Sequence, residues 1–388
     1  MASVKDFFKK YTMVIALVVI FSIFCVLTKG TILFPQNFNN LLAQNAYVFV
    51  LATGMLLCIL TGGNIDLSVG SVVCFVGGIG ALMLQKGYNT FVTVLVMLIV
   101  GTIIGAWQAF WVAYVDVPPF IATLAGMYAF RGLSNVVLGG FTVTVSNPKF
   151  LSIFGGGENC YIPDFIGNGS GLNMTCMIVG ILAVVIFIGA SLGRRIWVSK
   201  KGFTKGSNVG YAVKCICIAA AVIFITYKLA GYKGIPTSLC WVLLIIFIYH
   251  YITTKTTTGR HLYAIGGNEK ATRLCGINTK KIYFIAYTNM GLLAGFAAII
   301  TIARLASAQP TYGMAYEMDA IGACFIGGAS AYGGTGTVFG TIIGALLMGV
   351  INQGMSIMGV NANYQKVVKG IVLLVAVIFD VLSKREKK

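Results

Sequence analysis

Few residues in this chain have the chemistry of a functional site, and Asp66 is the first of them. It is one of ten acidic residues among 388 and lies in TGGNIDLSVGS, residues 61–71, where two apolar segments meet. A carboxylate near a bilayer is costly, so it needs protein or water partners, and Asn64, Ser68 and Ser71 are the nearest. Two roles stay open: a first-turn acid that stabilises the next helix, or direct contact with a polar solute.

A second set of candidates lies in GAWQAFWVAYVDVPPFIATLAGMYAFRGL, residues 105–133. Its tryptophans combine flat apolar faces with a hydrogen-bonding edge, which suits sugar rings, although an aromatic belt at a membrane interface is the alternative. Pro118 and Pro119 predict a helix break before Phe120. The candidate residues for a solute pathway are Asn64, Asp66, Ser68, Trp107, Gln108, Phe120 and Thr123.

The longest polar run in the second half of the chain is GRHLYAIGGNEKATRLCGINTKK, residues 259–281. Membrane-length apolar segments precede and follow it, so both of its ends are held at a membrane face. Gly266-Gly267-Asn268 indicates a turn, with Asn268 as N-cap of a short helix that ends at Gly276 in the C′ position. An ordinary charged connector is the alternative interpretation.

Other chemistry has little support in the sequence. There is no G-x-x-x-x-G-K-[ST] phosphate loop, no nucleophile elbow and no H-E-x-x-H, so the sequence predicts neither ATP binding by this chain nor a membrane enzyme. With only His250 and His261 as histidines and no C-x-x-C pair, no metal site or other cofactor is expected. Cys160 and Cys176 could form a disulfide if residues 141–171 lie outside the cytoplasm.

The composition explains what positions these residues. The chain is 58% hydrophobic and 10% charged, with a mean hydropathy of +0.89, whereas about 25% charged residues is usual in soluble proteins. The net charge is +18, and most basic residues fall in four clusters beside apolar segments, at residues 5–10, 194–214, 255–281 and 384–388. The positive-inside rule accounts for this charge, so no nucleic-acid partner is implied.

The predicted fold is an all-α polytopic membrane protein with twelve transmembrane helices, or ten as the nearest rival. Alternation from a cytoplasmic start places all four basic clusters, and both termini, in the cytoplasm. Segments 119–139 and 316–330 are short or interrupted by glycine and are expected to cross only partway, next to a pathway. The twelve segments are 11–27, 41–60, 67–84, 91–114, 119–139, 172–192, 215–230, 238–252, 283–304, 316–330, 337–354 and 364–383.

Two short sequences recur along the chain. CFVGGIGA (residues 74–81) returns as CFIGGASA (residues 324–331), and GTIIGA occurs at residues 101–106 and 340–345. The alternating topology orients the copies oppositely, so residues 41–140 and 283–383 are candidate inverted repeats with a pathway between them. The paired glycines of GTIIGA are expected to bring helix backbones close together.

Three motifs in order carry a resemblance to a known family. GNIDLSVGS, VPPFIATLAGM with FRGL, and GRHLYAIGGNEKATRLCGI are similar to the permeases of ABC-type monosaccharide importers of the ribose, galactose and xylose kind, most like the xylose or multiple-monosaccharide branch. The resemblance implies that residues 253–282 form a cytoplasmic coupling loop whose helix enters a cleft of an ATPase subunit. The contact residues that it implies are Gly266, Gly267, Asn268, Glu269, Ala271, Arg273 and Gly276.

The resemblance also implies an organisation and partners. Residues 1–388 are expected to form one permease domain of a bacterial plasma membrane protein, in which 194–252 is an inserted helix pair and 141–171 is a landing surface for an extracytoplasmic sugar-binding protein. A homodimer would work with an ATPase that binds ATP and Mg²⁺, and import xylose, galactose, glucose, arabinose or ribose. A secondary sugar transporter driven by an ion gradient is the rival, and a passive channel a third interpretation.

Overall fold

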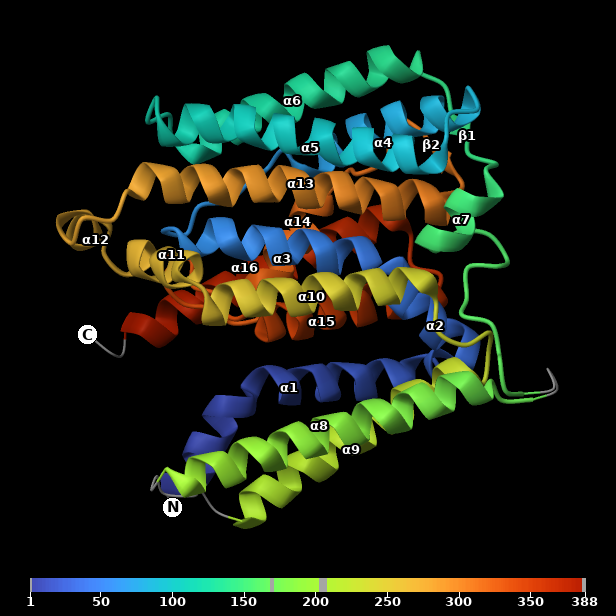
Figure 1. The fold of residues 1–388 in the computed structure, drawn as a ribbon, viewed down its shortest axis with the longest axis vertical. Coiled ribbons are helices and arrows are strands. Elements are labelled where there is room, and N and C mark those ends of the chain that lie inside the picture. Colours follow the sequence, from blue (N-terminus) through green and yellow to red (C-terminus); the bar gives the residue numbers. More distant parts are fainter. Residues whose placement is uncertain (1, 168–170, 202–207, 386–388) are drawn as a thin grey trace. The chain divides into compact units, whose positions relative to one another are not determined.

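The structure, a computed structural model, describes residues 2–167, 171–201 and 208–385 and is almost entirely helical (Figure 1). The all-α prediction is confirmed, apart from one two-stranded antiparallel sheet in which β1 (Val143–Thr144) pairs with β2 (Ser307–Ala308), Val143 opposite Ala308. The helices are α1 (Ala2–Leu27), 3₁₀ helix η1 (Thr31–Leu33), α2 (Pro35–Gln44), α3 (Ala46–Leu60), α4 (Val69–Gln85), α5 (Thr90–Ala113), α6 (Pro119–Leu138), α7 (Pro148–Phe154), α8 (Met174–Lys200), α9 (Asn208–Ala230), α10 (Thr237–Lys255), α11 (Thr257–Gly267), α12 (Glu269–Leu274), α13 (Thr279–Leu305), α14 (Tyr316–Ile326), α15 (Val338–Ile357) and α16 (Ala362–Arg385).

The chain divides into two compact units, where one domain was expected. The bundle unit comprises Met1–Ile32, Leu41–Cys160 and Ser238–Lys388, and the hairpin unit comprises Leu33–Asn40 and Tyr161–Thr237. In the hairpin unit α8 packs against α9, and the Asn173 N–H donates to Ala230 O at 3.0 Å. α9 packs on α8, whereas α10 from Ser238 onward belongs to the bundle unit. That residues 194–252 are an insertion stays a prediction.

Eight helices of the described residues are long and apolar enough to cross a membrane, and the apolar parts of α1 and α4 are shorter. Each of the twelve predicted segments overlaps a helix, although their count as spans stays a prediction. α14 has 11 residues and so extends only about 16 Å, half of the roughly 30 Å hydrocarbon thickness. The expectation of a partial crossing is wrong for α6, which is continuous over 20 residues from Pro119.

Glycines allow α5 and α13 to approach closely in the bundle. A Cβ at Gly101 would lie 2.6 Å from Gly291 O, and one at Gly105 would lie 2.7 Å from Tyr287 O. Only hydrogen atoms fit there, so the backbones meet directly. The second GTIIGA copy works in the same way, because Gly344 lies against Ala323 O of α14. The packing role predicted for these glycines is confirmed.

Two non-helical stretches lead into the middle of the bundle. Residues 61–68 connect α3 to α4, and residues 309–315 connect β2 to α14. The second stretch meets the first turn of α4, where a Cβ on Gly70 or on Gly313 would lie 2.1 Å from the other glycine's carbonyl oxygen. The Arg131 guanidinium of α6 donates to Pro310 O at 3.1 Å, so it binds backbone carbonyls of the second stretch. Irregular backbone of this kind is stable at membrane depth only where protein surrounds it.

The repeated sequences occupy corresponding helices. The CFVGGIGA copy lies in α4 and the CFIGGASA copy begins in α14, each helix following one of the non-helical stretches. The two GTIIGA copies lie in the next helices, α5 and α15. This placement agrees with a duplicated arrangement, and the inverted orientation of residues 41–140 and 283–383 stays a prediction.

The described part of the segment from 141 to 171 contains β1 and α7. All ten cysteines lie in the described ranges and none forms a disulfide, so Cys160 and Cys176 are not bridged. Asp164 accepts hydrogen bonds from the backbone N–H groups of Gly167, Met174 and Thr175 and from the Thr175 hydroxyl. Partial desolvation acts to raise its pKa, but these four donors outweigh it and hold the Asp164 pKa well below its usual range.

Candidate functional site

The polar run that follows α10 folds into two short helices, α11 and α12, at one end of the bundle unit (Figure 1). Asn268 is the N-cap of α12, and its side-chain oxygen accepts from the Ala271 N–H at 2.9 Å. Gly276, with φ of +80°, occupies the C′ position. The predicted helix and both of its caps are confirmed. The predicted turn at Gly266-Gly267 is wrong, because both residues complete the last turn of α11.

The outer surface of α12 is strongly exposed. Leu274 is 89% exposed, which is unusual for a leucine on a short polar helix. Ala271, Arg273 and Gly276 are also exposed. Gly266 differs from the other predicted contact residues, because a Cβ there would lie 2.0 Å from Leu60 O and 2.1 Å from Gly334 N. Gly266 therefore seats α11 against the end of α3, and the contact roles of this set stay predictions.

A hydrogen-bonded link connects α12 to the first non-helical stretch. The Tyr283 hydroxyl, on the first turns of α13, lies 3.0 Å from Glu269 Oε2 and 2.9 Å from Thr61 O. Thr61 begins the stretch that carries Asn64 and Asp66. The Asn64 amide donates to Thr61 O at 3.2 Å. Through Tyr283, a displacement of α12 reaches α13 and the start of the 61–68 stretch together.

Three of the predicted pathway residues form a hydrogen-bonded chain. Asp66, 3% exposed, accepts from the Ser68 N–H at 2.8 Å and from the Ser68 hydroxyl at 2.6 Å. The Gln108 amide of α5 donates to Ser68 Oγ at 2.7 Å. The space beside this chain, bounded by Met290 and Gly291 of α13, is too small for a water molecule. In this conformation the geometry favours the structural role of Asp66.

The other predicted pathway residues divide by exposure. Thr123 is fully buried on α6, one turn before Gly126, whose missing Cβ leaves room for the Gln108 amide. Trp107 and Phe120 are 44% and 55% exposed, so they face away from the bundle interior. Trp107 packs edge-on against Trp111 and Phe130. This placement suits the alternative interpretation, an aromatic belt at a membrane interface. The pathway role of Trp107 and Phe120 stays a prediction.

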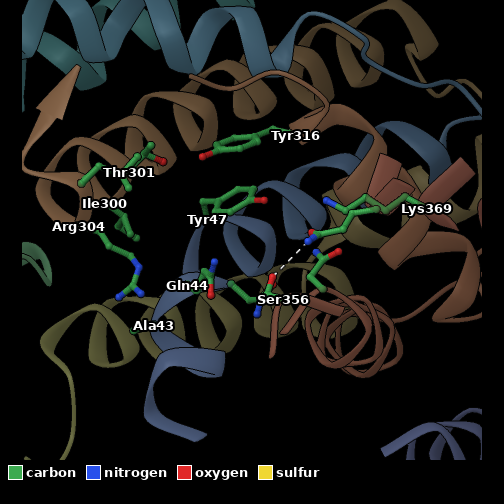
Figure 2. Close-up of a pocket in the computed structure, with 13 residues that line it drawn as sticks. Ala43, Gln44, Tyr47, Ile300, Thr301, Arg304, Tyr316, Ser356 and Lys369 are labelled. Carbon is green, nitrogen blue, oxygen red and sulfur yellow. Dashed lines mark hydrogen bonds between the residues drawn. The ribbon is translucent and has the colours of Figure 1, made fainter. Parts of the chain in front are cut away.

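A polar cavity lies elsewhere, at the other end of α13, and no sequence motif indicated it (Figure 2). It has a volume of about 210 Å³. The rings of Tyr47 and Tyr316 stack at its wall, with centroids 3.7 Å apart. Its lining residues come from six helices and the connection between α2 and α3: Ala43, Gln44, Asn45, Tyr47, Ile300, Thr301, Arg304, Leu305, Tyr316, Asn352, Ser356, Gln365 and Lys369.

A buried ion pair anchors this cavity wall. Lys369 Nζ lies 2.8 Å from Asp319 Oδ1, and the two side chains are 17% and 2% exposed. The Tyr47 hydroxyl donates to Asp319 Oδ2 at 2.9 Å, which fixes the ring in place. The signal that the sequence offered was the pair of acidic residues Glu317 and Asp319 in an otherwise apolar segment.

Comparison with known proteins places these features in a family. The family model described as "Branched-chain amino acid transport system / permease component" matches residues 37–377. The chain is 36% identical over 376 residues to the xylose transport system permease protein XylH of Escherichia coli (strain K12), covering 97% of this chain and 92% of that protein.

Two further relatives extend the comparison. The XylH protein of Haemophilus influenzae is 37% identical over 386 residues, covering 97% of each chain. The ribose import permease protein RbsC of Escherichia coli (strain K12) is 36% identical over 346 residues, covering 89% of this chain and 85% of that protein. No solved structure matches. The family match covers most of the chain, so this protein belongs to the family of transport-system permease components.

Proposed function

We propose that this chain is the membrane-spanning permease subunit of an ATP-driven ABC importer that carries a pentose, of the xylose or ribose type, into the cell. The xylose permease XylH and the ribose permease RbsC align over 97% and 89% of this chain, which supports the substrate class. The observation that carries the proposal is the capped, protruding α11–α12 segment. A permease without a motif for ATP binding needs a docking surface through which an ATPase subunit can move its helices.

The proposed docking surface for the ATPase is the exposed side of α12. Leu274 supplies an apolar contact and Arg273 a positive charge, while Asn268 and Gly276 define where the helix starts and ends. An exposed apolar side chain beside an arginine and framed by polar residues resembles the apolar core and polar rim of a protein interface. ATP and Mg²⁺ belong to the partner in this proposal, and the chain itself has no catalytic role.

The proposed coupling runs through the Tyr283 hydroxyl. When ATP binding draws two ATPase subunits together, α12 moves with its subunit, and Glu269 transmits the movement to α13 and to the 61–68 stretch through Tyr283. α13 has 27 residues and is therefore about 40 Å long, which spans the bundle from the coupling end to β2. Tilting this helix alternates access between the two ends of the bundle.

The remaining parts of the proposal concern assembly. A second copy of the chain completes the importer, both termini lie in the cytoplasm with α12, and an extracytoplasmic sugar-binding protein docks at the end that carries β1, β2 and α7. The positive-inside rule supports this orientation, because the polar run around α11 and α12 is rich in lysine and arginine.

Reconstitution into liposomes tests the proposal. The permease with its ATPase and sugar-binding protein should accumulate xylose or ribose only when ATP is supplied on the ATPase side. The Glu269→Ala, Arg273→Ala double variant should lose uptake. A matched control is Asp116→Asn with Lys280→Ala, which removes an exposed 3.0 Å ion pair near the same end without touching α12. The permease alone, accumulating sugar on an ion gradient, would instead establish the secondary transporter.

A further inference from the structure

We propose that the cavity walled by Tyr47 and Tyr316 is a binding site for a single monosaccharide. This inference rests on the proposed function and adds to it the position at which the sugar binds. The cavity holds about 210 Å³. That is several times the roughly 30 Å³ taken by one water molecule and less than the roughly 300 Å³ at which pockets for drug-sized ligands begin. The size therefore selects one sugar ring and excludes a disaccharide.

The lining provides the groups that sugar hydroxyls need. Amides and hydroxyls both donate and accept, as each sugar hydroxyl does. Gln44, Asn352, Ser356 and Gln365 supply such groups from α2, α15 and α16. The Asn352 Oδ1 atom is buried and accepts no hydrogen bond from the described residues, so this oxygen is available to accept one from a ligand.

The aromatic wall is rigid. The rings of Tyr47 and Tyr316 lie at 18° to one another, and Figure 2 shows them parallel, between Arg304 and Lys369 in that view. Tyr47 is held through its hydroxyl by Asp319, which is itself held by Lys369. A fixed flat face and convergent polar groups together favour the alternating apolar and polar surfaces of a sugar over a lipid chain.

The charge of Lys369 does not by itself mark the cavity as an anion site. The Lys369 ammonium is already compensated by the Asp319 carboxylate, with both oxygens within 3.1 Å. A phosphate or sugar acid would have to compete with that carboxylate for the lysine. Both cations near the cavity remain capable of donating to sugar oxygens.

The position of the cavity gives the site a role in the import cycle. It lies among the end of α13, the end of α15 and the start of α16, whereas α12 lies at the beginning of α13. The site is therefore at the end where the sugar-binding protein is proposed to dock. A sugar released from that protein would be held here before the bundle opens toward the ATPase end.

A cavity-filling variant tests the site in the reconstituted importer. Ser356→Phe places a ring in the cavity from an exposed position, and Asn363→Phe is the matched control, exposed on the first turn of α16 and absent from the lining. Ser356→Phe should lower xylose and ribose uptake by roughly tenfold or more, while ATP hydrolysis stimulated by the loaded binding protein stays within about twofold of wild type. The control should transport normally. Gln365→Leu is a second, milder variant and should raise the sugar concentration for half-maximal uptake.

Labelling gives a direct measure of occupancy. Ser356→Cys should react with a membrane-impermeant maleimide, and xylose should slow that reaction, whereas Asn363→Cys should react at the same rate with and without sugar. Wild type provides the background from exposed cysteines. Normal uptake by Ser356→Phe, or protection by inorganic phosphate and none by xylose, would overturn the site. If the wild-type importer transports no sugar, the proposed function fails. That result is distinguishable from failure of the proposed site, in which wild type imports sugar and the cavity variants import it equally well.

Discussion

Two buried carboxylates, Asp66 and Asp319, have opposite environments in the same bundle. They are 3% and 1% exposed, and each lies next to a non-helical stretch that leads into a helix. Asp66 is satisfied by the neutral Ser68 N–H and hydroxyl groups, and no water fits beside it. Asp319 is satisfied by the Lys369 ammonium and the Tyr47 hydroxyl, beside a cavity of about 210 Å³.

The difference in surroundings suggests a structural role for Asp66 and a role beside a ligand site for Asp319. Around Asp66 the glycines at positions 70, 105 and 126 allow backbones and side chains to close without a gap. Around Asp319 the long polar side chains at the ends of α13, α15 and α16 keep a space open. A buried carboxylate therefore marks a site only when its surroundings leave room for a ligand.

Breaking the ion pair should have the largest effect. Asp319→Asn leaves the mostly buried Lys369 without a counter-charge, and removing one partner of a buried pair costs about 3–5 kcal/mol. The free energy of unfolding, measured with purified protein in detergent, should fall by that amount. Adding Lys369→Met should restore most of it. A loss below about 1 kcal/mol would mean that the pair behaves like a solvated surface pair and would undo the contrast with Asp66.

Substitution of Asp66 should destabilise the protein less than substitution of Asp319, and the negative charge of Asp66 should not be required for stability. Asp66→Ala leaves the Ser68 N–H without its acceptor and should cost about 1–3 kcal/mol. Asp66→Asn keeps an acceptor oxygen and should cost clearly less in the same unfolding measurement. If Asp66→Asn instead abolished sugar uptake while stability was unchanged, Asp66 would belong to the pathway after all.

Removing the hydroxyl of Tyr47 should sharpen the contrast further. Tyr47→Phe keeps the stacked ring but removes the 2.9 Å hydrogen bond to Asp319, a loss of about 1.5 kcal/mol for a bond to a charged group. Because the ring is then free to move, half-maximal uptake should require more sugar. Gln108→Leu, which removes a donor to Ser68, should leave that sugar concentration unchanged.

A third carboxylate, Asp164, offers a pH test and the smallest effect. Its pKa is lowered in the folded state, so its stabilisation is present above the unfolded pKa of about 3.9 and is lost as the pH falls toward the folded value. Asp164→Asn should lower the melting temperature by a few degrees at pH 7. The gap between variant and wild type should narrow as the pH drops below about 4. A gap independent of pH would show that the charge is irrelevant.

Sequence reasoning succeeded where the signal was local. Asn268 and Gly276 bracket α12 because a cap depends on residues three or four positions away. Pro118 and Pro119 separate α5 from α6 for the same reason. Gly126 was misleading, because it serves contact with Gln108 and Ser68 and does not interrupt α6.

The cavity could not be predicted in this way. Its polar residues are scattered over α2, α3, α13, α14, α15 and α16, up to 325 positions apart between Gln44 and Lys369, and only the tertiary fold brings them together. The assignment of α9 and α10 to different units could not be predicted either, since both are ordinary apolar segments in the sequence. What a segment packs against is a property of the whole bundle.

A photo-crosslinking amino acid at Leu274 tests the central claim most directly. In the assembled importer it should capture the ATPase subunit, and the yield should change when ATP is bound, because α12 is proposed to move with that subunit. A reagent at Lys86, in the exposed connection between α4 and α5, should not capture it. Failure of Leu274 to capture any nucleotide-hydrolysing protein in a complex that imports sugar would contradict the account.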